Sequence, residues 1–320
     1  MDYVALLKKE NMMTKKKILS WLGKLLMIAA LIFIAVRLMR YNVDFSILTS
    51  PLTIAGLLIN TIVLGLGVFL FAFNFVWLIR VLSGVAVERN PIVVVYCATN
   101  LYKYLPGNVL QFIGRNRIAF DTKGVNHSHV AFATVLEIVF FCLAAVLLAS
   151  IFAFEYFISA IRMMHAPPLV FALIFLLALV SVAVLFAFRE RMIALLKKHM
   201  KPNFHLKEMA ILLGNCSLRL VIMAGAYLLT LVLFGQPLAA YLAFRIIGLF
   251  VLSWVIGFVV PGAPGGLGIR EAIMLMFMSD MIDEGILVSS AVVYRVICIA
   301  GDVFAYLLAV VYTHETIHSP

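Results

Sequence analysis

The chain has 320 residues, of which 65% are hydrophobic and 12% are charged, and its mean hydropathy is +1.12. Soluble globular domains carry about a quarter charged residues, so this composition excludes that class and predicts an all-helical protein that crosses a membrane several times. The formal net charge of +10 lies in short segments between apolar runs, where basic residues mark the cytoplasmic side, so it does not predict nucleic-acid binding.

Six apolar runs are long enough to cross a bilayer as full helices, which takes about 20 residues. They are residues 18–38, 52–79, 129–153, 167–188, 209–234 and 285–312. The first run follows a lysine-rich segment, residues 1–17, but no small-residue cleavage site comes after it. We therefore expect a retained helix, and we expect residues 1–320 to form a single membrane domain because no polar stretch is long enough for a second one.

Two further apolar regions, residues 91–120 and 237–281, are each interrupted by a break that contains Pro-Gly. Proline lacks an amide donor, and broken backbone at membrane depth survives only inside protein or against a water-filled cavity. We therefore expect two re-entrant helical hairpins; the alternative is that each region crosses twice as ordinary kinked helices. The residues that interrupt the helices are Pro106 and Gly107 in the first break and Pro261, Gly262, Pro264, Gly265, Gly266 and Gly268 in the second.

The basic loops orient this arrangement. Residues 1–17 and the basic loop 189–207 should both be cytoplasmic, and the four full helices between them satisfy this, so the first interrupted region must begin and end on the same face. Residues 50–153 then form a first repeat and residues 208–312 a second repeat of opposite orientation, connected by the helix 167–188. Such an inverted-topology repeat is typical of transporters in the cell (cytoplasmic) membrane, here with both termini cytoplasmic.

Nine ionisable residues lie inside the apolar spans or at the breaks, where each costs about 2.5–3.5 kcal/mol unless it has a partner or a cavity. They are Lys103, Arg115, Glu137, Arg219, Arg245, Arg270, Glu271, Arg295 and Asp302. In the second repeat four arginines face two carboxylates, which leaves two positive charges without a local counter-ion. This surplus predicts a polar path for an anionic headgroup, because the planar guanidinium binds phosphate oxygens at two points.

A structural interpretation of the same residues stays open. Arginine–carboxylate pairs between packed helices are often structural, and Glu137 could neutralise one arginine. Lys103 and Arg115 could be cations that extend to the cytoplasmic face, and Tyr102 and Tyr104 fit an interfacial aromatic belt. The glycines of the second break could allow close helix packing or expose amides to an anion.

The motifs KYLPGNVLQFIGR and PGAPGGLGIREAIML, with Glu137 and Arg295 in the helices after each break, resemble the flippase-like transmembrane family of the lysylphosphatidylglycerol synthases. The resemblance extends from about Ser50 to Tyr312, although many relatives carry Gly-Glu where this chain has Leu110-Gln111. It implies a stand-alone lipid translocator of envelope lipid or glycan biogenesis, without the soluble aminoacyl-transferase domain. Membrane lipids are the implied partners.

Three functions compete. The first is a lipid flippase that moves an anionic or lipid-linked headgroup, with proton coupling through Glu137 or Asp302 as an additional hypothesis. The second is a polyprenyl-phosphate-dependent glycosyltransferase that uses the acidic segment 280–284. The third is an accessory subunit that holds a glycosyltransferase, or another envelope enzyme, through the loop 189–207. We expect no cofactor and no metal site, because the histidines and the four cysteines show no ligand spacing.

Overall fold

The computed structural model describes residues 49–84, 87–104, 110–123, 126–152, 206–237, 239–259, 266 and 268–318. All of its elements are helical, with no strand among the residues described. The predicted helices 18–38 and 167–188, the segment 1–17 and residues 189–205 of the basic loop lie outside these ranges. So do the break residues Pro106, Gly107, Pro261, Gly262, Pro264 and Gly265.

Two groups of helices make up the described chain, and we call them the first and second halves. The first half contains α2 (Pro51–Ser83), α3 (Arg89–Asn100), the 3-10 helix η2 (Leu101–Tyr104), α4 (Leu110–Lys123) and α5 (His127–Phe152). The second half contains α9 (Leu206–Leu233), α10 (Ala240–Val259), α11 (Ile269–Met278) and α12 (Glu284–His318).

Five helices are long and apolar enough to cross a membrane, namely α2, α5, α9, α10 and α12. This finding confirms the all-helical prediction and is compatible with a membrane protein. Helix α10 is long enough to cross alone, whereas α3 with 12 residues and α11 with 10 residues are too short to do so.

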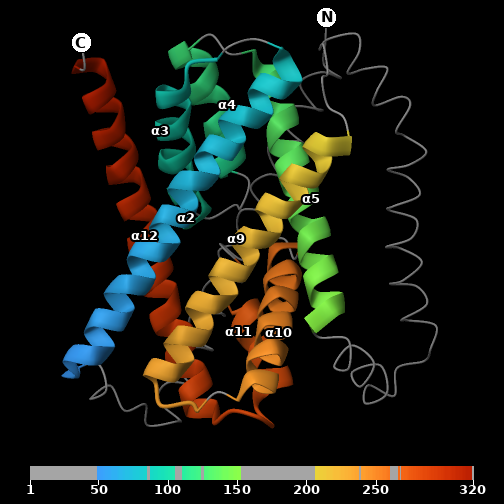
Figure 1. Cartoon of the computed structure of the whole chain (residues 1–320), viewed down its shortest axis with the longest axis vertical. Helices are drawn as coiled ribbons and strands as arrows, with labels where there is room; N and C mark the ends of the chain where they lie inside the picture. Colours follow the sequence, from blue (N-terminus) through green and yellow to red (C-terminus); the bar gives the residue numbers. More distant parts are fainter. Residues whose placement is uncertain are drawn as a thin grey trace, which may run out of the picture.

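The two halves run in opposite senses (Figure 1). Helix α2 rises from the lower end of the view to the upper end, α3 and α4 pack together there, and α5 descends. Helix α9 instead descends from the upper end, α10 and α11 pack together in the lower part, and α12 rises.

Contacts between the halves come in matching pairs. Helix α3 of the first half packs against α12, and α10 of the second half packs against α5. The long first helix of each half likewise packs against the long last helix of the other, α2 against α12 and α9 against α5, and α2 and α9 also contact one another. The pairs α3–α4 and α10–α11 are therefore each held by a long helix of the opposite half.

The α2–α12 contact is close because two glycines meet there. A Cβ atom added to Gly65 would lie 2.6 Å from the Gly301 carbonyl oxygen, and one added to Gly301 would lie 3.1 Å from the Thr61 carbonyl oxygen. Small residues let helix backbones approach in this way. The crossing fixes the first helix of one half against the last helix of the other.

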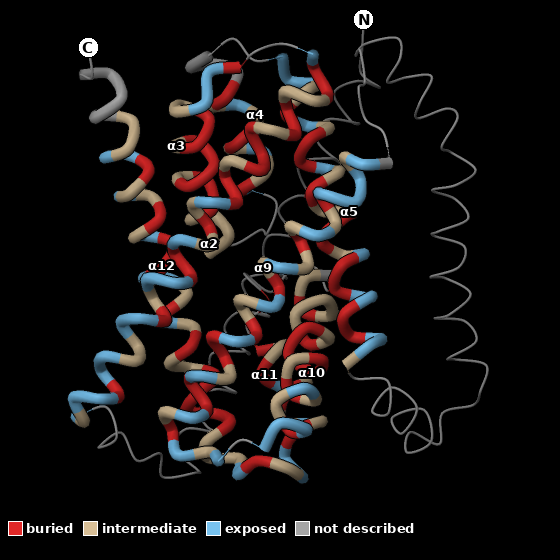
Figure 2. Tube along the Cα trace, in the orientation of Figure 1, coloured by how far each residue is buried: buried red, intermediate tan, exposed pale blue. Residues whose placement is uncertain are grey.

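Buried residues face the middle of the bundle, and many exposed residues on its outside are large and apolar (Figure 2). Leu52 is 78% exposed, and Leu70 and Leu218 are at least 60% exposed. Such a surface would be an aggregation liability in water, but it suits contact with lipid chains.

Candidate functional site

A cavity of about 160 Å³ lies between the two halves and is lined by residues of all the described helices except α2. We call it the central cavity. Its charged and amide-bearing lining residues are Asn100, Lys103, Gln111, Arg115, Glu137, Arg219, Arg270, Glu271 and Arg295. Its aromatic and hydroxyl lining residues are Tyr96, Tyr104, Phe112, Phe141, Tyr227, Phe250, Ser253, Trp254, Phe258 and Tyr294. Seven of the nine predicted path residues are thus brought together.

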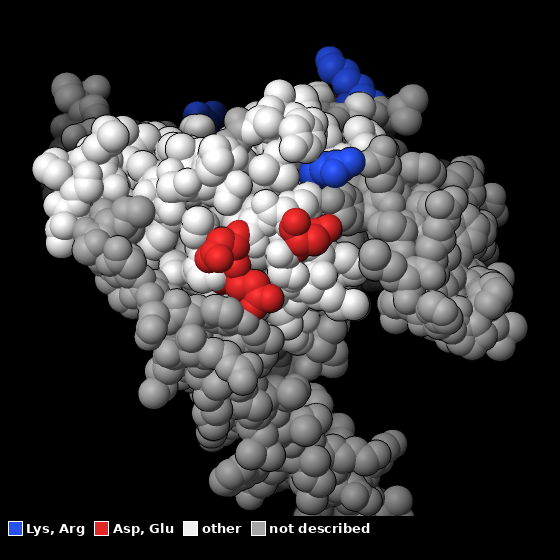
Figure 3. All heavy atoms as spheres, turned by 90° about the horizontal axis from the view of Figure 1, so that it is seen from below, with Lys and Arg blue, Asp and Glu red and all other residues white. Residues whose placement is uncertain are grey.

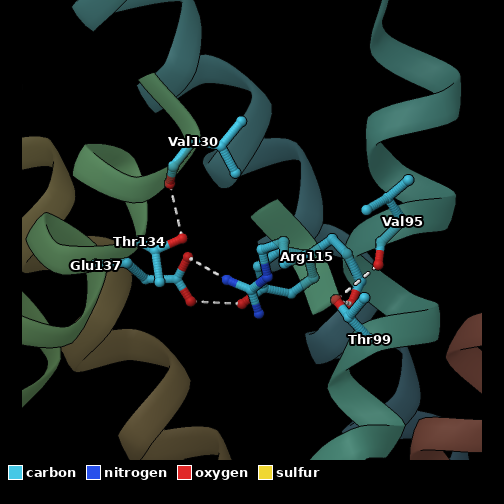
Figure 4. A network of polar contacts seen from close by, with 7 residues as sticks. Val95, Thr99, Arg115, Val130, Thr134 and Glu137 are labelled. Carbon is cyan, nitrogen blue, oxygen red and sulfur yellow. Dashed lines mark hydrogen bonds and ion pairs between the residues drawn. The ribbon is translucent and has the colours of Figure 1, made fainter. Parts of the chain in front are cut away.

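In the first half, Arg115 of α4 forms an ion pair with Glu137 of α5, with 3.4 Å between Nη1 and Oε2 (Figure 4). The other carboxylate oxygen of Glu137 accepts a 2.7 Å hydrogen bond from the Tyr96 hydroxyl. The Arg115 guanidinium also lies over the Tyr96 ring, 4.0 Å from its centroid. Because Arg115 is only 2% exposed, the interpretation of this residue as a cation reaching the membrane surface is wrong.

A second polar cluster joins the halves at Asp302 of α12, which is 2% exposed. Its carboxylate lies 2.6 Å from Lys103 Nζ and accepts hydrogen bonds from Asn100 Nδ2, at 2.7 Å, and from the Tyr104 hydroxyl. The Tyr104 hydroxyl is thus directed at a buried carboxylate of the other half. Asp302 does not itself line the central cavity. It holds η2, whose residues Lys103 and Tyr104 line the cavity, against α12.

In the second half, Glu271 joins the start of α11 to α12. Its Oε1 accepts a 2.7 Å hydrogen bond from Arg295 Nε, and its Oε2 accepts a 2.8 Å bond from the Gly268 amide. Arg295 also donates from Nη2 to the Gly266 carbonyl at 3.1 Å. The turn before α11 requires glycine at two positions, because Gly266 and Gly268 have φ values of 73° and 81°.

Two arginines of the cavity wall remain. Arg219 of α9 and Arg270 of α11 form no ion pair with any described carboxylate, and Nη1 of Arg219 and Nε of Arg270 are buried without a hydrogen-bond partner in the described part of the chain. Their guanidinium groups lie over aromatic rings, Arg219 at 4.7 Å from the Phe71 centroid and Arg270 at 5.2 Å from that of Trp254.

Glycines shape the space around Arg270. A Cβ atom at Gly257 would lie 2.5 Å from Arg270 Cγ, and one at Gly266 would lie 2.7 Å from Arg270 Nε. Neither position could carry a larger residue without moving the guanidinium. The sequence allowed two roles for Gly266, close packing or contact between its amide and an anion. In the structure Gly266 packs closely against the Arg270 side chain.

Arg245 and the acidic segment lie elsewhere. Arg245 of α10 is not among the cavity-lining residues, and its guanidinium lies 5.8 Å from the Tyr241 ring centroid. The acidic side chains of the α11–α12 turn lie on the lower face of the molecule (Figure 3). Asp283 Oδ1 accepts hydrogen bonds from the amides of Gly285 and Ile286, at 2.8 and 3.2 Å, and so caps the N-terminus of α12.

The structure adds residues that the sequence did not single out, including Tyr96, Asn100 and Trp254. Asn100 could have been recognised, because an amide inside an apolar run needs a partner. Tyr96 and Trp254 carry no such signal, since aromatic residues are common in apolar helices. No protein-family model and no curated protein matches this sequence.

Proposed function

We propose that this protein is a lipid flippase or transporter, which moves an anionic lipid headgroup between membrane leaflets through the central cavity. The observation that carries the proposal is the pair of arginines, Arg219 and Arg270, that lack carboxylate partners among the described residues but share one cavity. A buried cation without a counter-ion is unfavourable by several kcal/mol, about 2.5–3.5 on insertion scales, so an anionic ligand would stabilise this site.

The depth of the cavity supports the same function. Arg219 is near the middle of the 28-residue helix α9, whose length of about 42 Å matches a bilayer with its headgroup regions. Transporters commonly bind their substrates near the midplane, at the interface between two repeats.

The reciprocal packing supports an inverted-topology repeat. Exchanging α2 for α9, α3 for α10, α4 for α11 and α5 for α12 converts the set of contacts between the described α-helices into itself, leaving aside the contacts of η2. We infer that α3–α4 and α10–α11 are re-entrant hairpins that enter from opposite faces, and that alternating access exchanges the two openings of the cavity.

The charge distribution supports one orientation in the cell membrane. The upper end of the view carries Arg80 and Arg89, and α9 starts there with Lys207, whereas the turn at the lower end carries Asp280, Asp283 and Glu284. By the positive-inside rule the upper end is cytoplasmic. Single cysteines introduced at Lys207 and Asp280 should then be labelled by an impermeant maleimide from opposite sides, and labelling of both from one side would contradict this orientation.

The resemblance of PGAPGGLGIREAIML to the flippase-like family of the lysylphosphatidylglycerol synthases points to the same substrate class. The glycosyltransferase alternative needs a free acidic centre, whereas Asp283 caps a helix. The accessory-subunit alternative depends on the loop 189–207, most of which lies outside the described residues.

Reconstitution tests the proposal. Proteoliposomes with fluorescent phosphatidylglycerol should show translocation that falls at least about tenfold in Arg270→Gln, because a hydrogen bond to a charged group contributes about 1.5–3 kcal/mol. Arg245→Gln removes an arginine outside the cavity and is the matched control. Translocation at wild-type rates in both Arg219→Gln and Arg270→Gln would refute the proposed path.

An imposed pH gradient in the same assay tests whether transport is coupled to protons through Glu137 or Asp302. Transport rates that do not respond to the gradient would exclude that hypothesis.

A further inference from the structure

The described residues around the central cavity include more positive than negative charges, and the difference can be counted from the ion pairs. Among the described residues, three cations of the wall are each paired with one carboxylate: Lys103 with Asp302, Arg115 with Glu137, and Arg295 with Glu271. The wall cations that remain are Arg219 and Arg270. The described part of the cavity therefore carries two positive charges beyond those that its own carboxylates neutralise.

Aromatic rings hold both guanidiniums so that their donors stay available. The Arg219 Cζ lies 4.7 Å from the Phe71 centroid and 5.9 Å from that of Phe141, and the Arg270 Cζ lies 5.2 Å from the Trp254 centroid. Contact with a ring face attracts the cation without occupying its in-plane N–H groups. Because Phe141 and Trp254 pack at 5.0 Å, the two guanidiniums flank one continuous aromatic wall.

We propose that the central cavity, through the surplus charges of Arg219 and Arg270, binds a phosphate group with two negative charges, such as a phosphomonoester. This inference rests on the proposed function for the entry of a headgroup and narrows its substrate class. A phosphomonoester carries a charge of about −1.5 to −2 at pH 7, which matches the surplus, whereas a phosphodiester has one charge. A zwitterionic headgroup adds an ammonium group to a wall that is already cationic. The order of affinity is therefore phosphatidic acid, then phosphatidylglycerol, then phosphatidylethanolamine.

Trp254 offers a direct reporter, since it lines the cavity beneath Arg270 and is one of three tryptophans in the chain. Replacing the others, Trp21→Phe and Trp77→Phe, leaves its fluorescence as the only tryptophan signal. Titration in detergent micelles should show phosphatidic acid binding at least about tenfold more tightly than phosphatidylglycerol, because its second negative charge can form a charge-assisted hydrogen bond with the positive charge that a monoanion leaves unneutralised. A response to glycerol 3-phosphate as well would identify a free phosphate as a ligand, and a response to phosphatidic acid alone would identify a lipid phosphate; either supports the dianionic site.

Single substitutions in the reporter protein sharpen the test. Arg219→Gln and Arg270→Gln each leave one surplus charge, so each should lower the affinity for phosphatidic acid about 10- to 100-fold and reduce its advantage over phosphatidylglycerol. Arg219→Lys keeps the charge and should preserve the order of the three lipids. Arg245→Gln is the matched control, because it removes an arginine from α10 outside the cavity, and it should leave the affinities unchanged.

Two outcomes would overturn the inference. One is equal binding of phosphatidic acid and phosphatidylglycerol by the reporter protein itself, which needs no arginine variant to fold. The other is an unchanged preference in both glutamine variants. The translocation assay separates this result from the proposed function: a preference for the dianion without transport would refute the function alone, and transport without the preference would refute the inference alone.

Discussion

In each half of the molecule an ion pair joins the second short helix to the long helix that follows, but with opposite polarity. In the first half the arginine is on the short helix and the carboxylate follows 22 residues later, Arg115 to Glu137. In the second half the carboxylate is on the short helix and the arginine follows 24 residues later, Glu271 to Arg295. Both halves thus contain this ion pair, but the positions of the arginine and the carboxylate are exchanged.

This exchange of positions determines which half carries positive charge without a carboxylate partner among the described residues. Glu137 neutralises the arginine of its own short helix, whereas Glu271 is engaged by Arg295 and by the Gly268 amide, so the adjacent Arg270 keeps its charge. Arg219, the other surplus arginine, is also in the second half. Among the described residues, the unneutralised charge of the cavity therefore lies in the second half.

The largest difference between the halves is expected from removing the two carboxylates. Glu271→Gln breaks a buried pair at 2.7 Å and should lower the free energy of unfolding by about 3–5 kcal/mol. Glu137→Gln should cost less, about 1–3 kcal/mol, because its arginine is 3.4 Å away and the Tyr96 hydroxyl can still donate to the amide oxygen. Denaturation in mixed micelles measures both. Equal losses would show that the two pairs are equivalent, and adding Arg295→Gln to Glu271→Gln should recover part of the loss.

The next effect concerns the link between the halves. Asp302→Asn weakens three contacts of one carboxylate, and we expect a loss of about 2–3 kcal/mol, moderated because Lys103 can reach solvent. The exposed Asp280→Asn is the control and should change the unfolding free energy by less than about 0.5 kcal/mol. If both substitutions gave the same small change, Asp302 would not hold η2 to α12.

A smaller effect is expected at the helix crossing between the halves. Gly65→Ala places a methyl group 2.6 Å from the Gly301 carbonyl oxygen and should destabilise by about 1–3 kcal/mol, because backbone must move. Gly67→Ala, two residues along α2, meets only Ile222 Cγ2 at 4.0 Å and should be neutral or stabilising by about 0.5–1 kcal/mol. Thermal unfolding of the two variants side by side checks this, and a stabilising Gly65→Ala would contradict the close crossing.

The smallest effect is expected at the cap of α12, where Asp283 accepts hydrogen bonds from two amides, whereas at α5 Asn126 accepts one, from the Ser128 amide at 3.0 Å. Asp283→Ala removes two amide partners and should cost about 0.5–2 kcal/mol with transport retained. Loss of an enzymatic activity in this variant, with the protein still folded, would instead revive the glycosyltransferase alternative.

The sequence predicted the long helices well because their apolar runs record the bilayer thickness directly. The predicted runs 52–79, 129–153, 209–234 and 285–312 correspond to α2, α5, α9 and α12, with ends that differ by a few residues. The partners of the charged residues were harder to predict. Nothing in the spacing of Lys103 and Asp302, which lie about 200 positions apart, indicates that they pair.

The predicted surplus of two positive charges agrees in number with the structure for a different reason. The prediction counted Arg245 and assigned Asp302 to the arginines of the second repeat. In the structure Arg245 lies outside the cavity and Asp302 pairs with Lys103. The two differences cancel, because one removes a cation from the count and the other removes a carboxylate. The sequence could not show either difference, because packing with distant segments sets which side of a helix faces the cavity.

The unneutralised arginines also bear on the seal of the membrane. A positive charge held in a low-dielectric interior repels other cations strongly, and pores that must exclude protons and metal cations place an arginine at the constriction for this reason. In the proposed flippase, Arg219 and Arg270 would impose such a barrier on the space between the two halves. The same charges that favour an anion would therefore oppose the leakage of protons and potassium ions during transport.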